Sequence, residues 1–266
     1  MISERFETPG DVRLEVRCAE GDIELEAAEG VGVTEVEVDA HGSDDAVREL
    51  LEATRVELRD GRELIVHVPK RGGLFRRSLD VRIAIRAPEG ADVRIDAASA
   101  DTRARGRFGA FAANCASGDV EAASVRELNV KSASGDVRVA EVEGAVGVNT
   151  ASGDVTLGRV GGTLTVNSAS GDVSVREAAA DATVSTASGD VAVGAVVQGR
   201  VKLRSASGDL EVGIAKGSSV WVDARSLSGD TTSEVELGDG APADEGGPLV
   251  ELQAMTMSGD VSIVRG

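Results

Sequence analysis

The sequence is poor in aromatic residues. Phe, Trp and Tyr together make up 2% of the 266 residues, and there is no Tyr at all. Carbohydrate-binding solenoids display aromatic side chains that stack on sugar rings, so this composition disfavours such a site. The chain instead contains 33 Gly and has a hydrophobic fraction of 41%. Small aliphatic residues and Gly suit thin, stacked β-layers better than a wide globular core.

Long apolar segments and cysteines are also scarce. The N-terminus has no apolar core of a signal peptide, and no stretch approaches the roughly 18 apolar residues of a membrane-spanning helix. Two Cys are too few for a disulfide framework in a chain of this length. We therefore expect a cytoplasmic protein with no direct membrane insertion.

The charge is strongly one-sided. Asp and Glu number 46 against 28 Lys and Arg, which gives a formal net charge of −18. A chain with this charge repels phosphate backbones and anionic membrane surfaces. We therefore predict no nucleic-acid partner, and we expect cations or basic partners to be favoured.

One short phrase, Ser-Gly-Asp, recurs through the chain. Its eight copies follow one another at intervals of 17, 18, 18, 18, 19, 21 and 30 residues. The copies begin at Ser117, Ser134, Ser152, Ser170, Ser188, Ser207, Ser228 and Ser258. A nearly constant period of this length is typical of a repeat architecture, in which each copy is one structural unit.

The apolar pattern changes parity at each copy of the phrase. In the copy at Ser152, Val148 and Thr150 lie at even distances before it, whereas Val155 and Leu157 lie at odd distances after it. A shift of one residue moves side chains to the opposite face of a strand, so the chain must turn at the phrase. Each copy is thus predicted to form a strand, a corner, a second strand and a looser corner.

A single copy cannot fold alone. Its four or five aliphatic side chains contribute roughly 1.5–3 kcal/mol each when buried. Fixing the conformation of about 18 residues costs at least that much. Stability must therefore come from stacking, and the sequence predicts an all-β protein with one short helix, built as a β-solenoid or flattened two-sheet β-roll.

The two parts of the chain differ in pattern. Residues 91–266 are predicted to form the solenoid of Ser-Gly-Asp repeats, with a surface loop inserted at 238–248. Residues 1–90 are predicted to form a β-rich capping region with one helix at about 43–54, for which Ser43 is a suitable N-cap. We expect one continuous elongated domain, because open solenoid ends expose unpaired strands that need a cap.

The aspartates of the phrase form the main candidate site. They are Asp119, Asp136, Asp154, Asp172, Asp190, Asp209, Asp230 and Asp260. One interpretation is a row of carboxylates that binds Ca²⁺, a cation that prefers several oxygen ligands. The other is a structural turn, in which each Asp accepts backbone N–H groups of its own corner. The Gly-Gly-x-Gly-x-Asp phrase of calcium-binding repeats is missing, so we favour the turn and predict no metal or other cofactor.

A column of Ser and Thr precedes each corner by two residues, and Cys115 belongs to it. Cys18 lies in a degenerate copy of the same phrase, so both cysteines are predicted to be small core residues. Catalysis by one of the hydroxyls would need a neighbouring base, but His41 and His67 lie outside the repeats. We therefore predict no catalytic residue and no enzymatic activity.

One basic cluster interrupts the acidic sequence. Lys70, Arg71, Arg76 and Arg77 surround Leu74 and Phe75. This cluster is either a docking site for an acidic partner or a solvated hairpin tip. Trp221, the only Trp, is predicted to be a local core or capping residue.

The repeat resembles a known family. The SASGDV ladder, preceded by VRIAIRAPEGADVRIDAAS and ending in MTMSGDVSIVRG, is similar to the toast-rack, or putative-adhesin, β-strand-repeat family. The helix, DGRELIVHVPK and the basic loop resemble its soluble actinobacterial branch. The resemblance implies a β-solenoid and no established catalytic residues.

These observations predict a non-enzymatic β-solenoid scaffold that binds a protein partner or associates with itself. The alternative is a calcium- or carbohydrate-binding adhesin-like solenoid, or a lyase. Because the repeated phrase is explained as a corner, we expect a specific surface where the repeat is interrupted, at 70–77 or between Trp221 and Pro248.

Overall fold

The structure is a computed structural model that describes residues 1–8, 11–30, 32–70, 79–235 and 247–265. It is almost entirely β, with one helix among the described residues, which confirms the predicted fold class. None of the described helical segments has the length and apolar character needed to cross a membrane. The chain divides into two compact units, Met1–Asp136 and Val137–Gly266, each of which is described by itself below.

The first unit contains eight strands and the helix. They are β1 (Ile2–Glu7), β2 (Arg13–Ala28), β3 (Val33–His41), α1 (Asp44–Ala53), β4 (Arg55–Arg59), β5 (Glu63–His67), β6 (Asp80–Pro88), β7 (Asp92–Cys115) and β8 (Val120–Ser132). Helix α1 lies within the predicted range; Ser43 occupies its N-cap position without a side-chain hydrogen bond, and Asp44 and Asp45 complement the helix dipole.

Strand β2 is the first rung of the repeat. Its first half, from Arg13 to Arg17, pairs in parallel with β5 and with the start of β7. Its second half, from Asp22 onward, pairs with β6 and with a later part of β7. The turn between the halves aligns Asp22 with Asp101, so the degenerate copy of the phrase occupies a true rung position. Strand β3 pairs antiparallel with β6 and β1, and β4 pairs antiparallel with β5.

The second unit stacks strand–corner–strand rungs. Its strands are β9 (Val137–Val142), β10 (Val146–Thr150), β11 (Val155–Val160), β12 (Leu164–Ser170), β13 (Val173–Ala178), β14 (Ala182–Ser188), β15 (Val191–Val196), β16 (Gly199–Ser207), β17 (Leu210–Ile214), β18 (Ser219–Ser228), β19 (Thr231–Ser233), β20 (Leu249–Ser258) and β21 (Val261–Arg265). Strands β10, β12, β14 and β16 pair in parallel in one layer. Strands β9, β11, β13, β15 and β17 do so in the other.

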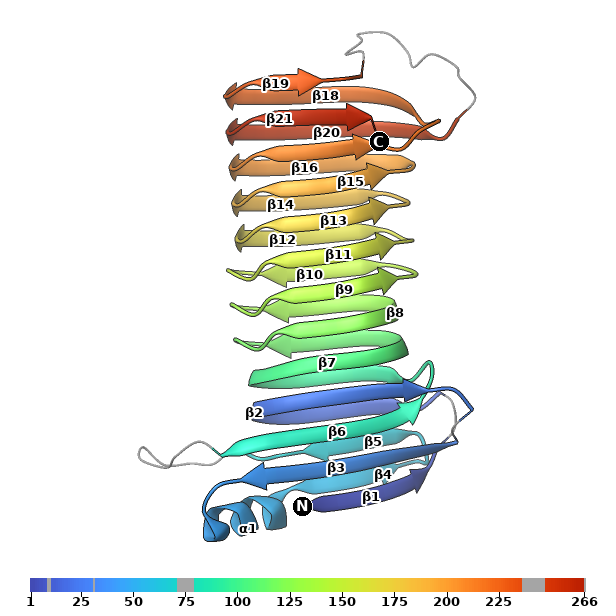
Figure 1. Cartoon of the computed structure of the whole chain (residues 1–266), viewed down its shortest axis with the longest axis vertical. Coiled ribbons are helices and arrows are strands. Elements are labelled where there is room, and N and C mark those ends of the chain that lie inside the picture. The colour runs from blue at the N-terminus through green and yellow to red at the C-terminus, as the bar shows by residue number, and fades with distance from the viewer. Residues whose placement is uncertain (9–10, 31, 71–78, 236–246, 266) are drawn as a thin grey trace. The chain divides into compact units, whose positions relative to one another are not determined.

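The last two rungs do not follow chain order. Strand β20 lies between β16 and β18, and β21 lies between β17 and β19. The final copy of the phrase is thus inserted as the penultimate rung, and the rung formed by β18 and β19 becomes the terminal one (Figure 1).

The change in apolar parity at the phrase correctly predicts which side chains are buried. Val148 and Thr150 are buried before the corner, and Val155 and Leu157 after it. The glycine of the phrase is needed at the corner for two reasons. Gly189 has a φ of 151°, and a Cβ placed there would lie 2.3 Å from the carbonyl oxygen of Gly171 in the adjacent rung.

Candidate functional site

The aspartates of the repeated phrase connect adjacent rungs. In each pair, a carboxylate Oδ1 accepts the backbone N–H of the aspartate in the next rung, at 2.8–3.1 Å. In the first unit the donor–acceptor pairs are Asp119–Asp101 and Asp136–Asp119; in the second they are Asp172–Asp154, Asp190–Asp172, Asp209–Asp190, Asp260–Asp209 and Asp230–Asp260. We expected the bonds within each corner, but the described bonds join neighbouring rungs.

This arrangement uses one carboxylate oxygen of each pair for a backbone donor. Within the described ranges, no group of three or more His, Cys, Asp or Glu side chains is arranged to hold a metal ion. The geometry gives the aspartates a structural use, in which each carboxylate offsets its repulsion from the next with an N–H bond.

The two cysteines lie in one column of the first unit, separated by Ala97. Cys18 pairs with Ala97 across β2 and β7, and Ala97 precedes Cys115 by one repeat. Both thiols are free and buried. Burial, with a further contribution from Cys115, raises the pKa of Cys18 from 9.0 to about 12. Burial and the carboxylate of Asp96 raise the pKa of Cys115 to about 11.

Of the other predicted residues, the structure describes only some. Lys70 is exposed at the end of the segment after β5. Arg71, Leu74, Phe75, Arg76 and Arg77 lie outside the described residues, so the predicted docking cluster remains a prediction. Both histidines are exposed, His41 at the end of β3 and His67 at the end of β5.

A pocket of about 230 Å³ lies on the outer face of the first unit, over β3, β6, β2 and β7. Sequence analysis did not identify it. The outward side chains of these strands form rows across the sheet, because residues in register project to the same face. One row consists of Glu35, Arg86, Glu26 and Arg105, so its charges alternate from strand to strand.

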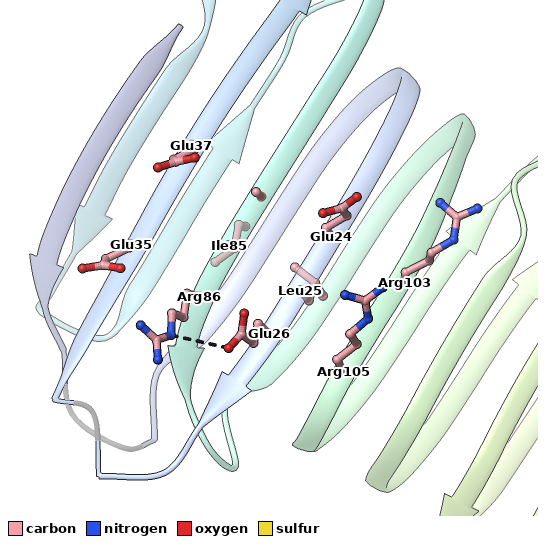
Figure 2. A pocket seen from close by; sticks show the side chains of 10 residues that line it. Glu24, Leu25, Glu26, Glu35, Glu37, Ile85, Arg86, Arg103 and Arg105 are labelled. Carbon is pink, nitrogen blue, oxygen red and sulfur yellow. Dashed lines mark ion pairs between the residues drawn. The ribbon is translucent and has the colours of Figure 1, made fainter.

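The neighbouring row departs from this alternation. It consists of Glu37, Ala84, Glu24 and Arg103 in the same strand order. Ala84 thus occupies the position that corresponds to Arg86 in the first row. Its side chain is a single methyl group in register between Glu37 and Glu24, and Figure 2 shows these two glutamates at the pocket.

Close ion pairs involve only some of the charged groups around the pocket. Arg86 Nε lies 3.6 Å from Glu26 Oε1, and an Arg82 nitrogen lies 2.5 Å from Glu24 Oε2. The Glu24 hydrogen bond is the main cause that raises the pKa of Arg82. Among the described residues, Glu37 and Arg105 form no hydrogen bond or ion pair. The charge of Glu37 also helps to raise the pKa of Arg82, and the space over Ala84 lies between Glu37 and Glu24.

Comparison with protein families identifies the fold. A family model described as Toastrack DUF4097 matches residues 12–264. The chain belongs to the Toastrack family. A comparison with curated proteins gave no match.

Solved structures share the Toastrack architecture at low sequence identity. A protein of Parabacteroides distasonis, described as a putative lipid binding protein, is 13% identical with a TM-score of 0.55, over 99% of this chain and 96% of that chain. A putative adhesin of Bacteroides fragilis is 11% identical with a TM-score of 0.47, over 100% and 96% of the two chains. At these identities the first likeness shows the fold alone.

In this Toastrack chain the repeated aspartates form hydrogen bonds between rungs. The pocket lies where the alternation of charges across the strands is interrupted at Ala84. The sequence feature that points to it is the single outward Ala in Arg82-Ile83-Ala84-Ile85-Arg86.

Proposed function

We propose that the protein is a non-enzymatic interaction scaffold that binds a protein partner through the pocket over Ala84. The partner inserts a lysine or arginine side chain between Glu24 and Glu37. One observation supports this most directly: Ala84 occupies the position in its row that Arg86 occupies in the neighbouring row of alternating charges.

The electrostatics favour a basic partner segment. Glu37 has no ion pair among the described residues, while its neighbours in the sheet are already paired. A cationic side chain entering the pocket forms charge-assisted hydrogen bonds with carboxylates, which contribute roughly 1.5–3 kcal/mol each. The net charge of −18 attracts such partners from a distance.

The calcium-binding alternative has less support. The aspartates of the phrase give an oxygen to the N–H of the next rung, and the described residues contain no group of metal-ligating side chains. The cytoplasmic location expected from the sequence stays a prediction.

A displayed peptide library tests the proposed site. We expect peptides selected on the wild-type protein to be enriched in Lys and Arg. Ala84→Arg supplies the missing cation from within the sheet, so we expect it to weaken their binding roughly tenfold or more. Glu37→Gln removes the unpaired carboxylate and should weaken binding in the same direction.

Thr165→Arg is the matched control, because it adds the same side chain at an exposed outward position of β12 in the second unit. Ala84→Arg completes an alternating row, and opposite charges across strands contribute roughly 0.2–1 kcal/mol, so its stability should not fall. Peptides without basic residues, or equal binding to Ala84→Arg and wild type, would contradict the proposal.

A further inference from the structure

The terminal rung of the second unit has an open edge. Strand β18 pairs with β20 on one side, and on its other side none of the described residues pairs with it. The strand is ten residues long, and its sequence contains neither Lys nor Pro, the residues that commonly protect edge strands. Between Val220 and Leu227, no described strand pairs with the backbone on that side, so a second strand can pair there.

The core is incomplete at the same place. Val222 occupies the same inward column as Val201 and Leu252, which are fully buried, but it is only half-buried. Val220 is half-buried as well, whereas its neighbour Val250 is not exposed at all. A further strand on this edge would cover the inward side chains that the stack leaves open.

The outward side chains also change at the end of the stack. The residue just before the phrase is Ala in six copies, at positions 116, 133, 151, 169, 187 and 206. In the last two rungs it is Leu227 and Met257, which are 81% and 60% exposed and adjacent in the register of β18 and β20. Trp221 is half-buried and, six residues before Leu227 in the same strand, lies on the same outward side of β18. Exposed apolar side chains gathered at one edge mark an interaction surface.

We propose that two copies of the chain associate through β18, paired antiparallel about a two-fold axis at Ala224. A symmetric pair presents the same strand from both copies, and a two-fold axis across one strand edge makes the two strands antiparallel. This contact uses a different unit and different residues from the pocket over Ala84, so it goes beyond the proposed function and does not depend on it.

Charge selects this register. With the axis at Ala224, Asp223 lies opposite the partner's Arg225, and Trp221 lies opposite the partner's Leu227. An axis at Asp223 would place Asp opposite Asp, and an axis at Arg225 would place Arg opposite Arg; both are unfavourable. A shift by an odd residue count would pair inward with outward side chains.

The strand already shows the pairing on which this register depends. Arg225 Nε lies 2.9 Å from Asp223 Oδ1 on the outward face of the same strand. In the symmetric pair, the two Asp and two Arg alternate around the axis, so every charge gains a second opposite neighbour. The apolar pairs flank this centre on both sides.

Charge reversal tests the proposal in solution. We expect sedimentation velocity to show a concentration-dependent dimer for the wild-type chain. Arg225→Asp and Asp223→Arg each place like charges opposite each other at two symmetric positions, so each should raise the dimer dissociation constant roughly tenfold or more. The double reversal, Asp223→Arg with Arg225→Asp, should return it to near the wild-type value.

Arg204→Asp is the matched control, since Arg204 lies in the same outward column two rungs inside the stack. It should leave the dissociation constant unchanged, and circular dichroism checks that every variant is folded. A wild-type chain that is monomeric at all concentrations would overturn the proposal, as would a dimer that tolerates Arg225→Asp.

A cross-link tests the register separately. In a background of Cys18→Ser and Cys115→Ser, Ala224→Cys places two thiols on the axis, where opposite Cα atoms lie about 4.5–5.5 Å apart. We expect an intermolecular disulfide under mild oxidation. Arg204→Cys in the same background should give none. A dimer that forms no disulfide through Ala224→Cys would overturn the Ala224-centred register.

Discussion

The inner rungs of the second unit and its terminal rung have the same pattern but different environments. In β16, Val201 and Leu203 are completely buried between neighbouring strands. In β18, Val222 and Ala224 occupy the same columns and are half-buried, because among the described residues the strand has a neighbour on one side only. A repeated residue thus contributes to stability according to its place in the stack.

The difference also separates architecture from binding. Positions that recur in every rung are used by the stack, as the aspartate bonds between rungs illustrate. Two positions break the pattern: Ala84 interrupts a row of charges, and Leu227 replaces an alanine in the terminal rung. We therefore expect binding surfaces at exceptions to the repeat.

Truncation of Val201 in an inner rung and of Val222 in the terminal rung should give the largest difference in the free energy of unfolding. Val201→Ala removes fully buried methyl groups and leaves a cavity between two rungs, so we expect a loss of roughly 2–3 kcal/mol. Val222→Ala removes groups that are already half in water, and we expect less than about 1 kcal/mol in the monomer. Urea unfolding of both variants at low protein concentration measures the difference.

The same pair of variants reports on the open edge. If β18 pairs with a second copy, Val222 becomes covered and the cost of Val222→Ala should rise with protein concentration, while that of Val201→Ala stays constant. Equal costs for the two variants at low concentration would contradict the contrast between inner and terminal rungs.

Much of the fold follows from the sequence because each rung repeats the same one-residue shift in its apolar alternation. Alternation at Val148 and Thr150 and at Val155 and Leu157 can be satisfied only if the chain turns between them. The degenerate copy around Asp22 was likewise predicted, and the register with Asp101 confirms it. These features depend on residues close in sequence, so local pattern is sufficient.

The order of the last rungs and the pocket could not be predicted in the same way. Both final copies contain the phrase and fit either position, so no residue pattern states that β20 lies between β16 and β18. The pocket depends on strands far apart in the chain, whose register places Glu37 and Glu24 on either side of Ala84. Register between distant strands is a property of the folded sheet.

Substitution of Asp190 and of Asp230 should give a smaller difference in the free energy of unfolding. Asp190 accepts the N–H of Asp209 at 2.8 Å, and Asp190→Ala should cost about 1 kcal/mol because that donor must then bond to water. Asp230 is in the terminal rung; it donates its own N–H to Asp260, but its carboxylate accepts no hydrogen bond from any described residue. Asp230→Ala should therefore change the free energy of unfolding by no more than about 0.5 kcal/mol.

Thermal unfolding of the two aspartate variants at neutral pH, with and without added Ca²⁺, gives the measurement. Added Ca²⁺ should leave the difference unchanged if the column is structural. A Ca²⁺-dependent rise in the melting temperature of the wild type that Asp190→Ala abolishes would favour the calcium interpretation instead.

For the column two residues before the corner, we expect a slightly smaller effect on stability than that of Asp190→Ala, and only at alkaline pH. The second unit has Ser or Thr there, such as Ser168, whereas Cys18 in the first unit has a pKa raised from 9.0 to about 12 by burial. The folded chain therefore retains the thiol proton longer than the unfolded chain. The resulting stability is present below pH 9 and is lost as the pH rises toward 12.

Comparison of wild type with Cys18→Ser at pH 7 and pH 9.5 isolates this thiol, since Ser does not ionise in this range and Cys115 is common to both chains. The wild type should lose roughly 0.8 kcal/mol more than the variant between the two pH values. The chain has no Tyr whose phenol would titrate near the same pH. Identical losses would mean that the Cys18 thiolate is tolerated in the fold, and that the interior beside β7 admits more water than its burial implies.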